Sequence, residues 1–424
     1  MKRYESYMES GISWLGSIPA HWKMQRAKYM FKKEKREVRP EDKVVTCFRD
    51  GQVTLRENRR TTGFTESITE LGYQGIRKGD LVIHQMDAFA GSIGVSDSDG
   101  KGTSVYHCCT PKGAFISEYY AFVLREMARA GFIQSLYRGI RERSSDFNFQ
   151  TFGNQYLPIP PKDEQICIAA FLDKKLSLIE SWKSQKEKQI QALNELKQAE
   201  IASAVTKGLN TKVKMKDSEI PWLGSIPIHW EIKRAKYMFK KEKREVRPED
   251  KVVTCFRDGQ VTLRENRRTT GFTESITELG YQGIRKGDLV IHQMDAFAGS
   301  IGVSDSDGKG TSVYHCCTPK GAFVSEYYAL VLREMARTGF IQSLYRGIRE
   351  RSSDFNFQTF GNQFLPIPPK EEQIEIVSNI HQRTDKIDKM IVSLNNEINH
   401  LLEYKQRLIS DVVTGQINVQ NEVE

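Results

Sequence analysis

The sequence has no stretch of about 18 consecutive apolar residues, the length a membrane-spanning helix needs, although 39% of its residues are hydrophobic. The opening MKRYESYMESGISW has no apolar core of the signal-peptide kind. Cysteine is also scarce: the seven cysteines are odd in number and show no CxxC spacing, which argues against a disulfide framework or a zinc ribbon. We therefore expect a cytoplasmic protein with reduced thiols and no membrane association.

Signatures of catalysis are missing as well. DAFAGSIG, from Asp87, has glycines spaced G-x-x-G and does not open a helix, so it predicts a bent strand and not a cofactor loop. GKGTS, from Gly100, lacks the Ser or Thr of a phosphate loop and predicts a hairpin turn. No methyltransferase N/D-P-P-Y/F motif or helicase signature occurs. The nearest approach to a metal site contains two adjacent cysteines, which rarely reach one tetrahedral ion: His84, His107, Cys108 and Cys109. We expect no catalytic residue, metal site or cofactor in this chain.

Charge favours an acidic partner, but only weakly. The chain carries 63 Lys and Arg against 54 Asp and Glu, a formal net charge of +9, within a sequence that is 28% charged. The run KYMFKKEKREVRPEDK nearly balances acids against bases, and we interpret it as a solvated helix face.

A long internal repeat organises the sequence. Shifting the chain by 208 positions aligns WLGSIPAHW at Trp14 with WLGSIPIHW at Trp222, without a gap. Residues 26–165 and 234–373 then differ at only five positions: Ile116/Val324, Phe122/Leu330, Ala130/Thr338, Tyr156/Phe364 and Asp163/Glu371. Each copy is long enough for its own hydrophobic core, so two similar globular domains are expected and not a solenoid.

Beyond residue 165 the copies diverge, yet an apolar pattern persists. Isoleucines recur every eleven residues, close to three helical turns, and form one stripe on a long helix in each copy: Ile168, Ile179, Ile190 and Ile201, matched by Ile376, Ile387, Ile398 and Ile409. Each segment predicts a helix of about 40 residues. Because helices of this length with one apolar face usually lie against another long helix, the two segments are expected to pair.

The predicted fold is α+β: two near-identical mixed α/β domains joined by two long helices that form an antiparallel coiled coil. Within each copy, DLVIH and SIGVS predict strands, DSDGKG a turn, and SEYYAFVLREMARAGFIQSLYRG a helix over the sheet. LPIPPKDEQ and LPIPPKEEQ precede the long helices, because proline disfavours helix and acidic residues suit a helix N-terminus. The expected segments are domain 1 at 1–160, helix 1 at 161–208, domain 2 at 209–368, helix 2 at 369–415 and a tail at 416–424.

Basic clusters mixed with Asn, Gln, Ser and His suit recognition of a DNA groove, because Arg pairs with guanine or phosphate and Asn or Gln with adenine. RGIRERSSDFNF, which occurs twice, is the densest such cluster, although a solvated face remains an alternative for any one arginine. In the first copy the candidate DNA-binding residues are Arg56, Arg59, Arg60, His84, Gln85, Asp87, Lys101, Ser104, Arg138, Arg141, Arg143, Ser144 and Asn148. In the second copy they are Arg264, Arg267, Arg268, His292, Gln293, Asp295, Lys309, Ser312, Arg346, Arg349, Arg351, Ser352 and Asn356.

WLGSIPAHW, LGYQGIRKGDLVIHQMDAFAGSIGVSDSDG, and LPIPPKDEQ before a long helix, all repeated, resemble the specificity subunit of type I restriction-modification enzymes over essentially the whole chain. The resemblance implies two target-recognition domains that bind double-stranded DNA and long helices that dock two methyltransferase subunits. Restriction and translocase subunits would join through the complex. S-adenosylmethionine is then expected in the methyltransferase partner, and ATP and Mg in the restriction partner.

The chain departs from this family in one respect. Family members typically have dissimilar recognition domains and similar spacers, whereas here the domains are nearly identical and the spacers differ. An old duplication followed by replacement of one domain with a copy of the other would give this pattern. Identical domains related by an approximate two-fold axis predict an interrupted palindrome as the target. A free-standing DNA-binding regulator and a nuclease with an unrecognised active site remain the alternatives.

Overall fold

The computed structural model describes residues 2–59, 72–136, 147–267, 280–344 and 355–422. The chain divides into two compact units: unit 1 comprises 1–186 and 396–424, and unit 2 comprises 187–395. Two long helices, α5 (Lys162–Lys207) and α10 (Lys370–Val413), each contribute one half to each unit. The two predicted long helices are thereby confirmed.

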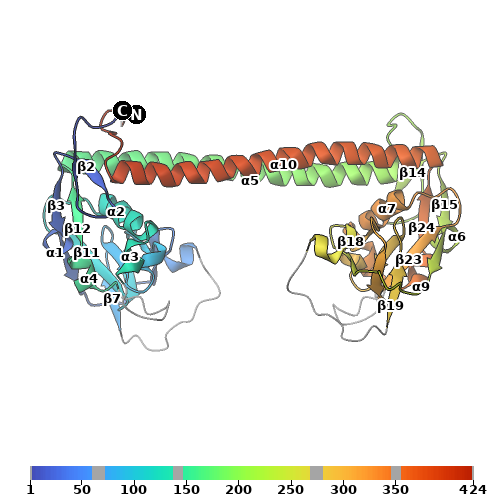
Figure 1. The fold of residues 1–424 in the computed structure, drawn as a ribbon, viewed down its shortest axis with the longest axis horizontal. Helices are drawn as coiled ribbons and strands as arrows, with labels where there is room; N and C mark the ends of the chain where they lie inside the picture. Colours follow the sequence, from blue (N-terminus) through green and yellow to red (C-terminus); the bar gives the residue numbers. More distant parts are fainter. Residues whose placement is uncertain (1, 60–71, 137–146, 268–279, 345–354, 423–424) are drawn as a thin grey trace. The chain divides into compact units, whose positions relative to one another are not determined.

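Unit 1 holds the first globular domain, in which short strands outnumber helices (Figure 1). Its strands are β1 (Tyr7–Glu9), β2 (Ser17–Pro19), β3 (Lys23–Arg26), β4 (Phe31–Glu34), β5 (Val45–Cys47), β6 (Val53–Leu55), β7 (Tyr73–Ile76), β8 (Leu81–His84), β9 (Ile93–Val95), β10 (Gly100–Thr103), β11 (Tyr106–Pro111) and β12 (Tyr156–Ile159). Its helices are α1 (Ala27–Met30), α2 (Ser117–Arg129), α3 (Phe132–Ser135) and α4 (Phe149–Gly153), with 3-10 turns η1 (Arg56–Asn58) and η2 (Ala88–Ala90).

Unit 2 repeats these elements in the same order. Its strands are β13 (Met215–Asp217), β14 (Ser225–Pro227), β15 (Glu231–Arg234), β16 (Phe239–Glu242), β17 (Val253–Cys255), β18 (Val261–Leu263), β19 (Tyr281–Ile284), β20 (Leu289–His292), β21 (Ile301–Val303), β22 (Gly308–Thr311), β23 (Tyr314–Pro319) and β24 (Phe364–Ile367). Its helices are α6 (Ala235–Met238), α7 (Ser325–Arg337), α8 (Phe340–Ser343) and α9 (Phe357–Gly361), with η3 (Arg264–Asn266) and η4 (Ala296–Ala298).

A four-stranded antiparallel sheet, ordered β4-β11-β8-β9, forms the centre of domain 1. Both faces of this sheet are buried, because alternate residues of a strand point to opposite sides. On β11, Cys108 packs with Val45, Val53 and Val82, whereas Cys109 packs in the larger core under α2. The adjacent thiols therefore face different cores, which argues against their sharing a metal ion.

The seven thiols differ in access. Six are buried, and burial raises the pKa of Cys108 and Cys316 to about 12, whereas Cys167 on α5 is only partly buried. Because the thiolate is the reactive form and buried thiols are shielded, we expect one thiol per chain to react rapidly with a thiol-specific reagent under native conditions and all seven after denaturation. Cys167→Ser should abolish the rapid phase. A fast phase of two or more thiols would contradict the burial of the others.

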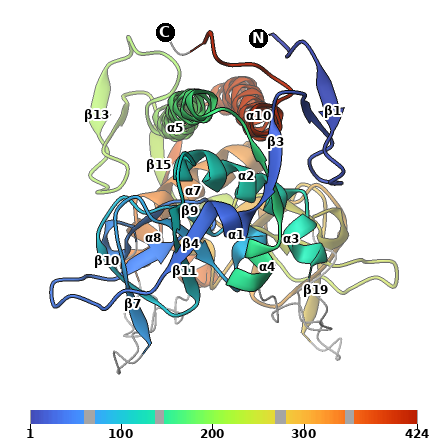
Figure 2. The ribbon, with the colours of Figure 1, turned by 90° about the vertical axis from the view of Figure 1, so that its left-hand side faces the viewer.

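Within each unit the halves of α5 and α10 run antiparallel and pack together, as Figure 2 shows for the helix pair lying over α2 in unit 1. Lys405 of α10 donates to Glu180 of α5 in unit 1, with Nζ 2.9 Å from Oε1. The equivalent positions pair in unit 2, where Lys197 donates to Asp388 at 2.7 Å. The two long helices differ at most positions, but this ion pair joins equivalent positions in both. The register between α5 and α10 is therefore the same in the two units.

Each globular domain docks on the C-terminal half of the long helix that does not follow it directly. Tyr119 of α2 donates to the backbone carbonyl of Val413 at 3.3 Å, and Tyr327 of α7 donates to that of Val205 at 2.9 Å. The eleven identities between 166–207 and 374–415 cluster there: eight fall in 190–206, namely Ile190, Leu193, Glu195, Lys197, Gln198, Ile201, Val205 and Thr206. Because near-identical domains need the same docking surface, these positions match although the rest of the helices differ.

Three local predictions were wrong. Gly100–Thr103 forms strand β10, paired with β7, where DSDGKG and GKGTS predicted a turn; the chain bends before it, at residues 97–98, and turns after it, at residues 104–105. KYMFKKEKREVRPEDK is not one helix face, since only Ala27–Met30 is helical and Phe31–Glu34 is strand β4. The helix predicted from Ser117 ends at Arg129, because Gly131 adopts a left-handed φ of 74° before α3 begins.

Candidate nucleic-acid interface

The β5–β6 hairpin presents the first group of candidate residues. Its tip closes through a hydrogen bond from the Phe48 amide to the Gln52 carbonyl at 2.9 Å. Arg59, just after η1, stacks on the Phe48 ring with its guanidinium carbon 4.4 Å from the ring centroid, and it pairs with Asp50 at 2.7 Å. Gly51 has φ of +90°, and a Cβ there would lie 2.5 Å from the Arg125 guanidinium. The tip is thus held in place by Arg59 on one side and Arg125 on another.

The end of strand β8 presents the second group, His84, Gln85 and Asp87. The Asp87 amide donates to Nδ1 of His84 at 3.1 Å, so Nε2 carries the proton of the neutral ring. Burial lowers the pKa of His84 below its ordinary value, which favours that neutral form near pH 7. Arg49 from the hairpin tip pairs with Asp87 at 3.2 Å and connects the two groups. Arg49, whose side chain is 69% exposed, was not among the predicted residues.

Backbone contacts bring residues after the second basic cluster to the same place. The Phe147 amide donates to the Gln85 carbonyl at 3.0 Å, and the Gln85 amide donates to the Val105 carbonyl at 2.8 Å. Asn148, predicted to contact DNA, accepts from the Thr151 amide at 2.9 Å and caps α4. The side-chain carbonyl of Asn148 therefore has a structural role. The adjacent Phe147, and not Asn148, makes the hydrogen bond to Gln85 at the end of β8.

The other predicted residues are scattered or lie outside the described part. Arg56 donates from Nε to Thr46 at 3.2 Å, Lys101 lies 5.6 Å from the centre of the Tyr73 ring, and Ser104 is exposed in a turn. Equivalent contacts recur in unit 2 for Arg264, Arg267, His292, Asp295, Lys309 and Asn356. Outside the described residues are Arg60, Arg138, Arg141, Arg143, Ser144, Arg268, Arg346, Arg349, Arg351 and Ser352.

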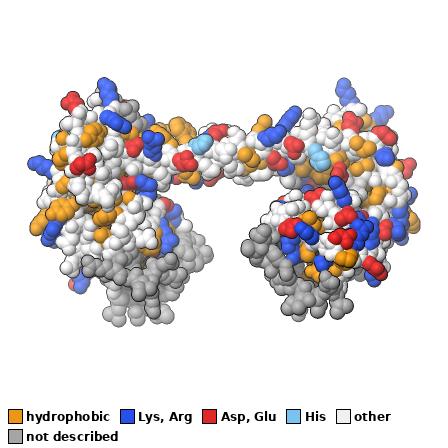
Figure 3. Space-filling model, in the orientation of Figure 1, with side chains coloured by type: hydrophobic (Ala, Val, Ile, Leu, Met, Phe, Trp, Pro, Cys, Tyr) orange, Lys and Arg blue, Asp and Glu red, His pale blue; other side chains and the backbone are white. Residues whose placement is uncertain are grey.

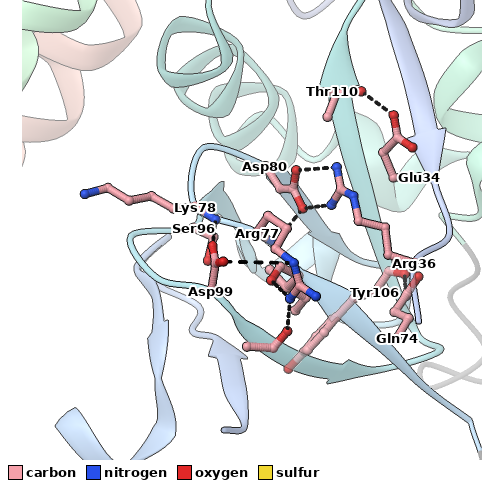
Figure 4. Close-up of polar contacts among 12 residues, drawn as sticks. Glu34, Arg36, Gln74, Arg77, Lys78, Asp80, Ser96, Asp99, Tyr106 and Thr110 are labelled. Carbon is pink, nitrogen blue, oxygen red and sulfur yellow. Dashed lines mark hydrogen bonds and ion pairs between the residues drawn. The ribbon is translucent and has the colours of Figure 1, made fainter. Parts of the chain in front are cut away.

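A buried ionic network of Arg36, Asp42, Arg77 and Asp80 lies at the start of strand β8 (Figure 4). Asp80, with a side chain only 3% exposed, accepts two hydrogen bonds from the Arg36 guanidinium and one from the Arg77 amide at 2.8 Å. Arg77 in turn pairs with Asp42 at 3.0 Å, and Asp42 is 1% exposed. The network joins the segment after β4 to the β7–β8 turn. Sequence reasoning missed it, because the partners are 35 and 44 residues apart.

Three basic side chains of this interface already form ion pairs. Arg49, Arg59 and Lys43 each have a carboxylate partner, in Asp87, Asp50 and Glu57. Exposed pairs of this kind contribute only about 0–1 kcal/mol, so a phosphate or a base edge can replace the carboxylate at small cost. Among the described residues no group of three or more His, Cys, Asp or Glu is arranged to hold a metal ion. The arrangement suits reversible polar recognition.

No described helix is both long enough and apolar enough to cross a membrane.

The chain is similar to known proteins in sequence and in fold. No family model matches the chain. The type I restriction enzyme EcoBI specificity subunit of Escherichia coli is 25% identical over 295 residues, an alignment covering 64% of this chain and 60% of that protein. The chain thus spans less than two thirds of this curated relative. Two solved structures share the fold. A chain from a study of complex assembly in the type I R-M system has a TM-score of 0.68 and 14% identity, covering 94% of this chain and 99% of that one. The HsdS subunit from Thermoanaerobacter tengcongensis has a TM-score of 0.56 and 15% identity, covering 96% and 100%.

Proposed function

We propose, from the homology of this chain to the specificity subunits of type I restriction enzymes, that it selects the DNA sequence on which partner subunits act. In this proposal the chain itself catalyses nothing, and methylation and restriction belong to the partners. Its two recognition domains bind double-stranded DNA through the hairpin tip, the end of β8 and the two basic clusters, with the equivalent surfaces in unit 2.

The observation that carries the proposal is the duplicated interface on equivalent supports. Each unit consists of one recognition domain, the first half of the helix that follows it and the second half of the other helix. The Lys–carboxylate pair and the tyrosine contact to the helix backbone recur in both units. Two equal readers on equal supports suit a target with two equal halves. We therefore propose an interrupted palindrome, with one half-site for each domain.

The long helices are the proposed docking surface for two methyltransferase subunits. Large apolar side chains are exposed on them, as is typical of protein interfaces. In unit 1 these are Leu178, Trp182 at 50% exposure, Leu402 and Tyr404; in unit 2 they are Leu196, Met390 at 54% and Val392 at 59%. Trp182 aligns with Met390 in the repeat, so the two docking surfaces have similar character but different side chains.

Mapping the modified bases in cells that carry this chain with its methyltransferase tests the proposal. We expect one interrupted motif whose two halves are reverse complements, because the two domains differ at only five positions over 140 aligned residues. A cell with the methyltransferase but without this chain is the control and should lack the motif. An asymmetric two-part motif would contradict equal reading by the two domains.

Two further outcomes separate the alternatives. If the chain binds DNA in cells without associating with a methyltransferase, and no modification depends on it, the free-standing regulator is favoured. If the isolated chain cleaves DNA when Mg²⁺ is added, the nuclease reading is favoured. Association with a methyltransferase chain together with motif-dependent modification supports the specificity subunit.

A further inference from the structure

A second basic surface lies on each recognition domain, on elements other than the β5–β6 hairpin and β8, and in unit 1 its Lys33 ammonium lies 6.0 Å from the centre of the Phe149 ring. In unit 1 it is built from β3, α1, β4, β12 and the residue after β11, and its side chains are Arg26, Lys28, Tyr29, Lys33, Lys112 and Tyr156. These six are called the basic–aromatic surface. Its parts are directly connected: Arg26 pairs with Tyr156 in the β3–β12 ladder, and Lys112 donates to the Lys28 carbonyl at 2.9 Å. It is therefore one continuous patch.

Aromatic rings hold the cations of this surface in place. The Arg26 guanidinium lies 5.2 Å from the centre of the Tyr156 ring, and the Lys28 ammonium lies 5.1 Å from that of Tyr29. Tyr29 is 57% exposed and Tyr156 is 45% exposed, which is unusual for rings of this size in a surface without a partner.

The charges here are not neutralised, in contrast to those at the β5–β6 hairpin. In the part of the chain that the structure describes, no carboxylate lies within ion-pair distance of Arg26, Lys28, Lys33 or Lys112. Glu34, next to Lys33 on β4, pairs with Lys32 at 3.2 Å and accepts from Thr110. Lys and Arg side chains interleave with hydrophobic ones along this edge of unit 1 (Figure 3).

Unit 2 repeats the surface with one informative change. Arg234 lies 5.0 Å from the Phe364 ring and Lys236 lies 5.3 Å from the Tyr237 ring, while Lys320 donates to the Lys236 carbonyl at 2.8 Å. Phe364 replaces Tyr156, one of only five differences between the copies. Both copies keep an aromatic ring under the arginine, but only the first has the tyrosine hydroxyl. The contact between cation and ring is therefore the feature that the two copies share at this position.

We propose that the basic–aromatic surface binds the phosphate backbone of double-stranded DNA outside the recognised half-site, independently of base sequence. Unpaired Lys and Arg are the groups that neutralise phosphates. A protein partner is disfavoured because lysine, which supplies three of the four unpaired cations, is depleted in protein–protein interfaces. The inference rests on the proposed function only in taking DNA as the partner.

The position of the surface makes it distinct from the reading interface. In Figure 1, β3, α1 and β12 lie at one edge of unit 1, whereas the short blue helix of residues 56–58, which leads to Arg59, lies at the opposite edge. One face of the domain therefore reads a half-site while the opposite face is free to hold another segment of the duplex. Such a contact adds affinity and salt dependence without adding sequence information.

The test uses the full chain and a 60-base-pair duplex of random sequence, with affinity measured over a range of salt. Replacing Lys28, Lys33 and Lys112 by Glu removes three proposed phosphate contacts. Since each contact contributes about 0.9 to the slope of log K against log salt, the slope should fall by about 2.7, with binding about tenfold or more weaker at 0.1 M salt. The matched control changes three exposed lysines of α5, Lys174, Lys188 and Lys207, to Glu.

Equal losses in the two triple variants, or no change in slope for the surface variant, would overturn the proposal, as would loss of a copurifying protein with DNA binding intact. Lys→Gln at the same three positions, with the native unfolding temperature as a check, serves if the Glu variant does not fold. The methylated motif should stay the same in the surface variant. A changed or absent motif in the wild-type chain would instead concern the proposed function, so the two failures are distinguishable.

Discussion

Asp80→Ala is expected to destabilise the first recognition domain by about 3–5 kcal/mol, because it leaves the half-buried Arg36 guanidinium without its carboxylate. The Arg77 amide loses its acceptor as well. For a domain of this size each kcal/mol lowers the unfolding temperature by roughly 2–4 °C, so the domain should melt roughly 6–20 °C lower. Asp80→Asn keeps the shape of the side chain but not its charge. Its unfolding temperature should lie between those of the wild type and Asp80→Ala.

The second copy supplies an internal reference for this measurement. Asp288 makes the same contacts in unit 2, so Asp288→Ala should destabilise that domain equally. In either single variant calorimetry should resolve two transitions, one unchanged and one lowered. The matched control is Glu57→Ala, since the Lys43–Glu57 pair is exposed at both ends and should contribute only about 0–1 kcal/mol. An Asp80→Ala chain that melts like Glu57→Ala would show that the network contributes little.

Phe147→Ala is expected to have a comparable effect and a second consequence for recognition. Phe147 is fully buried, with its ring 6.1 Å from that of Phe152, and truncation of a buried Phe costs about 3–5 kcal/mol. Phe147 follows the basic cluster of residues 138–144 in the sequence, and its amide donates to the Gln85 carbonyl at the end of β8. We therefore expect the variant to lose selectivity for one half-site while the other half-site is read as before.

The methylated motif is the measurement for this prediction. Phe355→Ala should relax the other half-site to the same degree, because Phe355 makes the same contacts with Gln293 and Phe360. Tyr156→Phe, which introduces the residue found in the second copy, is the control and should change neither stability nor motif. Relaxation of both half-sites by Phe147→Ala alone would mean that the two domains do not read independently.

The sequence predicted the features that rest on periodicity and repetition. The eleven-residue recurrence of isoleucine predicted both long helices, and the repeat predicted two domains of one mixed fold. The resemblance to type I specificity subunits is confirmed by the relative and the two solved folds. These features depend on many residues acting together, so one unusual residue does not hide them.

Features that depend on close packing could not be predicted in this way. Gly100 and Gly102 look like turn residues, yet they lie in β10. Glycine is needed at both positions because a Cβ at Gly100 would lie 2.4 Å from the Lys43 carbonyl and one at Gly102 would lie 2.5 Å from the Tyr106 ring. Their neighbours come from distant parts of the chain. The same holds for Arg36 and Arg77, because no local sequence pattern predicts which carboxylates pair with them. The candidate DNA-binding residues remain predictions, and several lie outside the described part.

The division of the chain has a consequence for its synthesis on the ribosome. Unit 2 is one continuous segment, 187–395, whereas unit 1 needs residues 396–424 to complete it. Leu408, Val412 and Val413 belong to the core of unit 1, and Asn418 forms a bridge with Lys2. The domain that emerges first therefore lacks part of its core until residues 396–424 have been synthesised, while the domain that emerges second is the first able to finish folding. N-terminal domains generally fold first, so this chain reverses the usual order.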